Sequence, residues 1–276
     1  MNRKLLMIAS DGGGENALKG VHYDKENYLR FFMSPEGGAW QKNNEIIVYD
    51  DNNFYLDSLR QIIINANAAR KPIDYFLIVY CGHGFTDQYG NTYFQIRPDC
   101  NLKVEDLQVT VKDSRCLLIA DSCRAICRLK EGGGITSNPY LFSTINEGVQ
   151  RTYAELCREM YDSHIAETPS NEYITYFSNS FGETAEENGN GGVYSYQLLS
   201  TAKEYISEFG SKQQYTGKSD WASIDSCHKR AKNRVIINTY GTQHPEVYQD
   251  TPSAAQFPFV VVPNYQLQLP DEDFML

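Results

Sequence analysis

Two short apolar runs stand out in the pattern of hydrophobic and polar positions: Tyr75–Gly84 (YFLIVYCGHG) and Ser114–Ala125 (SRCLLIADSCRA). Each is rich in apolar and β-branched residues, too short for a buried helix, and suited to a strand buried on both faces. Reactive residues end both runs, His83 in the first and Cys123 in the second. Because open parallel sheets bind ligands outside the carboxyl ends of their strands, we expect His83 and Cys123 to face one crevice.

The remaining periodicity predicts an α/β domain with a mostly parallel central sheet and helices on both faces. Leu56–Ala69 has apolar residues at helical spacing, and Pro72 ends that helix before the histidine strand. Gly90-Asn91 predicts a hairpin beyond the histidine. Further strands are predicted at Lys4–Ser10, Glu45–Tyr49, Tyr173–Ser178 and Gln256–Val262, the last closing the sheet, and further helices at Val21–Phe32, Glu147–Ser163, Tyr194–Phe209 and Ile224–Thr239.

Composition narrows the class of protein. A chain of 276 residues that is 41% hydrophobic can bury a sizeable core, and we expect residues 1–276 to form one domain. The net charge of −10 argues against a nucleic-acid partner and suits a cationic substrate. Met1–Ser10 is too short an apolar start for a secretory signal, and no run approaches ~18 apolar residues, so we expect a cytoplasmic protein without a membrane partner. Seven cysteines without a paired CxxC pattern fit reduced thiols.

The histidine and the cysteine together suggest nucleophilic catalysis. A thiol with a pKa near ~8.5 is only partly ionised at neutrality, and a neighbouring imidazole can take its proton. Glycines at 82 and 84 let the backbone approach a substrate closely. The N–H groups of Gly84 and Cys123 would form an oxyanion hole, so acyl transfer is the predicted reaction, and it requires no cofactor.

Several motifs in order along the chain resemble the caspase, metacaspase and paracaspase family of cysteine peptidases, especially its prokaryotic, metacaspase-like branch. The motifs are LKGVHYD at Leu18–Asp24, CGHG, ADSCRA, and YFSNSFGETAEENGNGGVYSYQLL within Ile174–Leu199. The resemblance implies a caspase-like (caspase-hemoglobinase) fold and a catalytic dyad of His83 and Cys123. It also implies that calcium can act as an activator, while the residues themselves leave any metal site unknown.

In the metacaspase-like branch, aspartates at the positions of Asp24 and Asp121 line an acidic pocket, and Cys81 stands where a small residue such as serine is usual. Two carboxylates in a narrow, partly dry cleft would bind a Lys or Arg side chain and repel an acidic one. The resemblance therefore predicts a protein or peptide substrate cleaved after Arg or Lys. Two other interpretations stay open: Asp121 caps the helix that follows it, and Cys81 is a buried small hydrophobe or a redox neighbour.

The segment after the cysteine is charged and glycine-rich at Arg128–Asn138 (RLKEGGGITSN), which is typical of an exposed linker. We expect an activation or intersubunit linker within residues 128–171. Members of the family are often cut there during activation, so the basic residues are candidate processing sites; the alternative is a solvated linker. The candidates are Arg128, Lys130, Arg151 and Arg158.

Three classes of function compete at this stage. The first is a latent, Arg- or Lys-directed cysteine endopeptidase, switched on by processing, calcium or an upstream activator. The second is a catalytically silent scaffold of the same fold, and the third is a cysteine hydrolase of small amides. A stand-alone domain resembles prokaryotic peptidases of antiviral defence or cell death that cut a partner effector. The residues do not decide between a monomer and a dimer.

Overall fold

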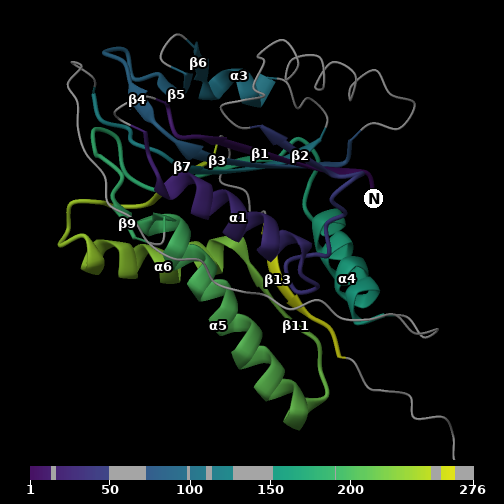
Figure 1. Ribbon diagram of the computed structural model, residues 1–276. Helices are drawn as coiled ribbons and strands as arrows, with labels where there is room; N and C mark the ends of the chain where they lie inside the picture. Colours follow the sequence, from purple (N-terminus) through teal and green to yellow (C-terminus); the bar gives the residue numbers. More distant parts are fainter. Residues whose placement is uncertain are drawn as a thin grey trace, which may run out of the picture.

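The computed structural model describes residues 1–13, 17–49, 73–97, 100–109, 114–126, 152–189, 191–249 and 256–264. Its centre is a six-stranded sheet with the order β12-β8-β7-β3-β1-β2 (Figure 1). Five of its strands run parallel, and β12 pairs antiparallel with β8 at one edge. The bounds are β1 Arg3–Ser10, β2 Ile46–Tyr49, β3 Tyr75–Gly82, β7 Arg115–Asp121, β8 Tyr173–Phe177 and β12 Glu246–Gln249.

Both faces of this sheet are buried, which explains why its central strands are apolar runs and do not alternate. Every residue of β3 is buried, and so is every residue of β7 after Arg115. Odd-numbered residues of β3, such as Leu77 and Val79, face one apolar cluster, and even-numbered residues, such as Phe76 and Ile78, face the other. The strands therefore hold two hydrophobic layers together.

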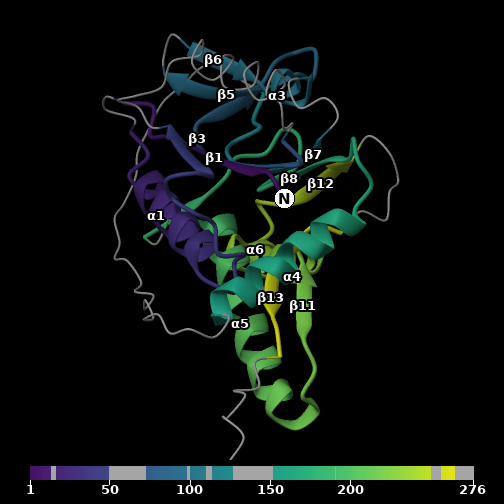
Figure 2. The same ribbon diagram turned by 90° about the vertical axis from the view of Figure 1, so that its right-hand side faces the viewer.

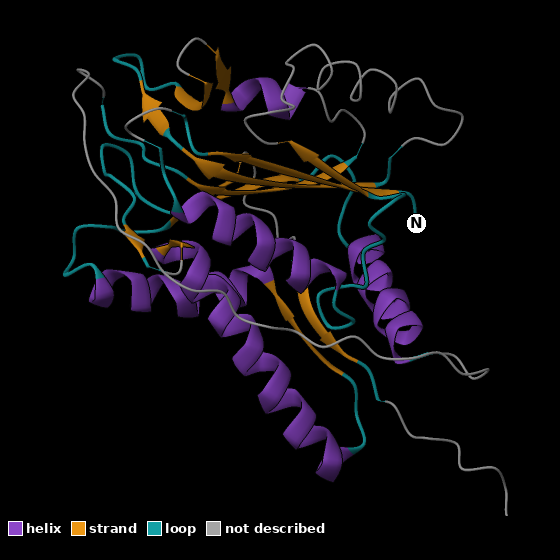
Figure 3. Ribbon diagram, in the orientation of Figure 1, coloured by secondary structure: helices purple, strands orange, loops and turns teal. Residues whose placement is uncertain are grey.

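Helices and small sheets cover the two faces, as Figures 1 and 3 show. One face carries α1, α4, α5 and α6, and their buried side chains join a single cluster with that face. The other face carries a three-stranded sheet and α3. The bounds are α1 Gly20–Met33, α3 Val104–Val109, α4 Tyr153–Glu167, α5 Val193–Thr216, α6 Ile224–Asn238, β4 Gly84–Thr86, β5 Thr92–Arg97 and β6 Cys100–Lys103.

The α/β fold and most predicted elements are confirmed, but the prediction for the last strand is wrong. β13 (Pro258–Val262) does not close the central sheet; it pairs antiparallel with β11 (Asp220–Ser223) in a separate ribbon among the helices (Figure 2). All five residues of β13 are buried, because the strand packs within the helical layer beside α4 and α5. The edge position belongs to β12, which the apolar pattern missed because its burial is only partial.

Three of the predicted segments lie wholly or partly outside the described residues. The helix predicted at Leu56–Ala69 and the glycine-rich stretch Arg128–Asn138 lie outside them. Of the helix predicted at Glu147–Ser163, the structure describes α4 from Tyr153, and Thr152 begins it with a capping box to Glu155. The Thr152 hydroxyl accepts the Glu155 N–H while the Glu155 carboxylate accepts the Thr152 N–H, so this helix start is well defined.

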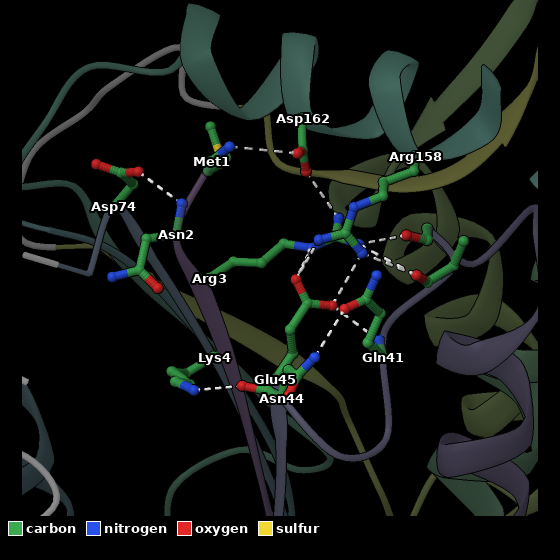
Figure 4. Close-up of polar contacts among 12 residues, drawn as sticks. Met1, Asn2, Arg3, Lys4, Gln41, Asn44, Glu45, Asp74, Arg158 and Asp162 are labelled. Atoms are coloured by element: carbon green, nitrogen blue, oxygen red, sulfur yellow. Dashed lines mark hydrogen bonds and ion pairs between the residues drawn. The ribbon is translucent and has the colours of Figure 1, made fainter. Parts of the chain in front are cut away.

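A buried arginine joins the first strand to α4 and to the segment before β2 (Figure 4). The Arg3 side chain is 0% exposed, pairs with Glu45 at 3.3 Å and Asp162 at 2.8 Å, and stacks over Trp40 with its guanidinium 4.3 Å from the ring centroid. Arg158 of α4 also binds Glu45. Burial pushes the pKa of Glu45 up, but the Arg158 hydrogen bond and the Arg3 charge outweigh it, so this pKa lies below its ordinary value.

Replacing the Arg3 guanidinium should destabilise the fold because it leaves buried acceptors without their cation. We expect Arg3→Met to lower the free energy of unfolding by about 3 kcal/mol, measured by urea denaturation at pH 7. The matched control is Lys212→Met, which removes an ion pair with Asp220 in which the lysine side chain is 57% exposed, and it should cost less than about 1 kcal/mol.

The pH dependence of stability is a second test of the ion pair between Arg3 and Glu45. Because the folded pKa of Glu45 is lowered, its contribution to stability is present above the unfolded pKa and is lost as pH falls through the folded pKa. The difference between wild type and Arg3→Met should therefore shrink in acid. A difference that is small at pH 7, or that grows as pH falls below about 4, would contradict this account.

Candidate active site

The register between β3 and β7 brings the two sequence candidates to the same edge of the sheet. Cys81 pairs with Asp121 at the carboxyl ends of these parallel strands. His83 and Cys123 each lie two residues further along the chain. Both side chains are half-buried, as expected for groups that line a site and do not belong to the core. The strands thus deliver a histidine and a cysteine to the same edge of the sheet.

Close packing holds the turn that carries the histidine. The Tyr80 hydroxyl donates to the His83 carbonyl at 2.6 Å, and the Tyr80 ring stacks on Phe94 with centroids 3.9 Å apart. Gly82 has a φ of +156°, and a methyl group there would collide with the Ser10 carbonyl. Gly12, with a φ of +81°, lies so close to the imidazole that a methyl group would meet Nε2 at 3.0 Å. Only glycine fits at both positions.

The proposed oxyanion hole has supporting backbone geometry. His83 accepts from the Gln95 N–H at 2.9 Å, so Gly84, opposite Phe94, falls in a non-hydrogen-bonded pair of the β4–β5 ladder. Its N–H therefore points away from β5, to the same side as the Thr86 N–H, which donates to the Ala125 carbonyl at 3.1 Å. A methyl group on Gly84 would lie 2.7 Å from the Cys123 carbonyl oxygen. The Gly84 backbone thus faces the cysteine segment directly.

The sulfur of Cys123 contacts a loop that belongs to the family motif within Ile174–Leu199. The Ala185 N–H donates to Cys123 Sγ at 3.3 Å, and the Ala185 carbonyl lies 3.8 Å from the same sulfur. Next in the chain, the Arg124 N–H donates to the Glu183 carbonyl at 2.9 Å. Arg124 also binds Glu246 and stacks over Phe177 at 4.1 Å. These contacts fix the backbone around the sulfur.

Asp24 of α1 and Asp121 of β7 converge on the amino terminus of α5. The Gly192 N–H donates to Asp24 Oδ2 and the Ser195 N–H to Asp121 Oδ2, both at 2.9 Å. These N–H groups lack intrahelical partners and carry partial positive charge, so carboxylates suit them. Asp121 does cap a helix, but it caps α5 and not the segment that follows it in sequence.

A third carboxylate, Glu187, joins this pair and was missed as an individual site residue. The segment that carries it was part of the family resemblance through its Ala-x-Glu pattern, Ala185-Glu186-Glu187, but no role was predicted for this glutamate. Glu187 interacts electrostatically with Asp24 and Asp121. Gly191 and Gly192 lie so close to Asp24 and Asp121 that side chains there would collide with the carboxylates. The glycines let the carboxylates approach the backbone.

Burial is the main influence on the titration of this acidic cluster, which we define as Asp24, Asp121 and Glu187. It raises the pKa of Asp24 well above the ordinary value, and the charge of Asp121 adds to the effect. Burial likewise raises the pKa values of Asp121 and Glu187. Among the residues that the structure describes, no lysine or arginine pairs with any of the three. The described residues thus supply the cluster with no compensating cation.

Cys81 lies beneath this cluster, between Ala9 and Asp121 in the strand register. It is 1% exposed, and burial together with the charges of Asp24 and Asp121 raises the pKa of its thiol well above the ordinary value. A buried, protonated thiol behaves as a small hydrophobe. Cys81 therefore forms part of the floor under the carboxylates.

Comparison with known proteins identifies the family. The family model described as "Caspase domain" matches residues 3–256. The chain belongs to the caspase-domain family of cysteine peptidases. Among solved structures, it resembles a Geobacter sulfurreducens protein with a TM-score of 0.59 and 14% identity over 94% of this chain and 97% of the other. Caspase-1 of Spodoptera frugiperda gives a TM-score of 0.52 and 13% identity over 90% and 88%. No curated protein matches.

One of the four candidate processing sites of the caspase domain can be placed. Arg158 lies within α4, where its guanidinium donates to the Ala39 carbonyl at 3.0 Å and binds Glu45. A peptidase binds its substrate extended, so the folded helix withholds this bond from cleavage. Arg128, Lys130 and Arg151 lie outside the described residues.

Within the described part of this caspase domain, none of the helices is long and apolar enough to cross a membrane.

No group of three or more His, Cys, Asp or Glu side chains in the same part has the geometry to hold a metal ion. The described residues therefore offer no ligand set for the activating calcium that the resemblance implies.

The acidic cluster should destabilise the fold increasingly as pH rises. A carboxyl whose folded pKa is raised contributes stability below its unfolded pKa and loses that contribution as pH rises through the folded value. We expect Asp24→Asn, which keeps an oxygen for the Gly192 N–H, to gain stability relative to wild type between pH 5 and pH 8. Urea midpoints at several pH values measure the trend.

The control for this trend is Asp225→Asn, which removes a half-buried carboxylate paired with Lys229 at 2.7 Å. Its difference from wild type should stay flat above pH 5 because the lysine balances its charge. If the Asp24→Asn difference were equally flat, the cluster would not be strained by burial of charge.

Proposed function

We propose that this caspase domain is a cysteine endopeptidase that cleaves proteins after Arg or Lys, with Cys123 as nucleophile and His83 as its base. The observation that supports this most is the strand register, which sets Asp121 beside Cys81 at the sheet end from which His83 and Cys123 project. A reactive pair and an acidic pocket then share one edge. Membership of a cysteine-peptidase family favours the same reaction class.

The chemistry follows from the proposed roles. The Cys123 sulfur attacks the scissile carbonyl carbon while the imidazole of His83 takes the thiol proton. The N–H groups of Gly84 and Cys123 bind the oxyanion of the tetrahedral intermediate. His83 then returns the proton to the leaving amine as the C–N bond breaks, and the acyl group stays on sulfur. Water, deprotonated by His83, hydrolyses the thioester and restores the thiol.

The acidic cluster supplies the specificity. An Arg or Lys side chain would provide the cation that Asp24, Asp121 and Glu187 lack. Two opposite charges ~4 Å apart attract by roughly 4 kcal/mol at an effective dielectric of ~20, and an acidic side chain is repelled by as much. Selectivity for a cation is therefore large, and its binding would ionise all three carboxylates.

The same site supports latency. Asp24 is only 3% exposed and Asp121 only 6%, and both are engaged by the N–H groups of α5. A substrate side chain therefore needs a rearrangement before it can reach them. We propose that processing at Arg128, Lys130 or Arg151, calcium or an activating partner supplies it.

We further propose a role in cytoplasmic antiviral defence or cell death through cleavage of a partner effector. This proposal rests on the resemblance to stand-alone prokaryotic peptidases. The engagement of the carboxylates also favours one alternative, a catalytically silent regulatory domain that keeps the fold without turnover.

Turnover is tested with fluorogenic peptides that carry Arg, Lys, Asp or Leu before the scissile bond, with and without calcium and limited pre-proteolysis. We expect cleavage of the Arg and Lys peptides only. Cys123→Ala and His83→Ala should each lower kcat by at least about 10³-fold because the nucleophile or its base is lost. Cys100→Ala, at another half-buried cysteine, is the matched control and should stay active. Inactive wild type under every condition supports the silent alternative.

Specificity is tested with Asp121→Asn and Glu187→Gln, which remove one charge each and keep the side-chain shape. We expect kcat/KM for the Arg peptide to fall about 10- to 100-fold, as for loss of a charge-assisted contact, and discrimination against a neutral glutamine peptide to narrow. Asp225→Asn again serves as the control. Equal losses on the Arg and glutamine peptides would show that the cluster does not read charge.

A further inference from the structure

The loop between β8 and α5, residues 178–192, contributes to both parts of the proposed site. Ala185 contacts the Cys123 sulfur, and Glu187 belongs to the acidic cluster. The two residues are separated only by Glu186. Whatever fixes the backbone at Glu186 therefore fixes the sulfur contact and the pocket wall together.

One buried side chain holds the backbone at this point. Gln243, which is 0% exposed, follows α6 in the connection to β12. Its Oε1 accepts the Glu186 N–H at 3.0 Å, and its Nε2 donates to the Ser178 carbonyl at 2.8 Å. Ser178 in turn accepts the Ser122 N–H through its hydroxyl at 3.2 Å. A single amide thus ties the loop to the end of the nucleophile strand.

The neighbours of Gln243 brace the outer side of the loop. The Thr242 hydroxyl donates to the Glu186 carboxylate. His244 pairs with Glu183 at 2.7 Å. These residues contact side chains of the loop, whereas Gln243 alone binds the N–H of residue 186. Gln243 is therefore the one expected to control where Ala185 lies.

In the contact between Ala185 and Cys123, the sulfur is better placed as an acceptor than as a donor. The Ala185 N–H lies 3.3 Å from the sulfur, whereas the Ala185 carbonyl, to which a thiol would donate, lies 3.8 Å from it. A hydrogen bond to an ionised acceptor is about twice as strong as one to a neutral acceptor. The geometry consequently favours the thiolate form of Cys123.

We propose that Gln243 is a positioning residue which, through the Glu186 backbone, holds the Ala185 N–H against the Cys123 sulfur and sets Glu187 in the acidic cluster. The role of this contact in catalysis rests on the proposed function, because it needs Cys123 as the nucleophile. Among the described residues, the charged and titratable groups closest in the chain to the sulfur, to the residues it contacts and to the end of β3 are His83, Asp121, Arg124, Glu183, Glu186 and Glu187. Gln243 carries no charge, so replacing it with a neutral residue leaves their total charge unchanged.

The test follows alkylation of Cys123 by iodoacetamide against pH, read by mass spectrometry of the peptide that contains it. Gln243→Leu removes both hydrogen bonds, and Gln243→Asn keeps a buried amide that is too short to span them. We expect each to raise the midpoint of the alkylation profile by about one pH unit, and to lower kcat/KM for the Arg peptide about tenfold, as for one lost charge-assisted hydrogen bond.

Two control variants separate positioning from general destabilisation. Gln213→Leu removes a glutamine hydrogen bond to the Pro263 carbonyl at 2.7 Å, in a segment of α5 remote from the sulfur. Thr242→Val removes the hydroxyl that binds the Glu186 side chain but leaves Gln243 in place. Both should keep the wild-type alkylation midpoint. If the Gln243 variants fold but keep that midpoint as well, the proposal is overturned.

The two proposals fail separately. Alkylation needs no turnover, so a shifted midpoint in a chain that cleaves no peptide upholds the positioning role and counts against the peptidase. An unshifted midpoint in an active enzyme overturns the positioning role and supports the peptidase.

Discussion

Parallel pairing between β3 and β7 is the constraint on which the proposed site depends. Their register aligns Cys81 with Asp121, and His83 and Cys123 each follow two residues later at the same edge of the sheet. Because both faces of these strands are buried, sliding the register by one residue would move every core side chain to the opposite layer. The two hydrophobic layers thus hold the proposed dyad in alignment.

The acidic cluster opposes the stability that the core provides. Carboxylates are costly to bury without a cation, and among the described residues Asp24 and Asp121 are held by N–H groups at the start of α5 and by no lysine or arginine. The buried Arg3, by contrast, pairs with both Glu45 and Asp162. A site that stores uncompensated charge is suited to a ligand of opposite charge.

Contacts from residues near β12 hold the backbone segments around the Cys123 sulfur in place. Gln243, His244 and Glu246 lie together in sequence near β12, yet they bind the loop after β8 and the arginine that follows the cysteine. Since β12 is an edge strand of the sheet, the contacts that support the proposed nucleophile extend to the edge of the sheet. A change at that edge therefore has a short covalent and hydrogen-bonded route to the site.

Local patterns in the sequence determined much of this protein: the apolar runs of β3 and β7, the reactive residues at their ends, and the glycines beside His83. These features depend on neighbours in the chain, so periodicity and motif reveal them. Only the tertiary structure placed β13 outside the central sheet, assigned an edge to β12, brought Ala185 to the cysteine and Glu187 to Asp121, and tied Gln243 to the Glu186 backbone. The Ala185 and Gln243 contacts join residues 57 to 65 positions apart in the chain, which no local pattern encodes.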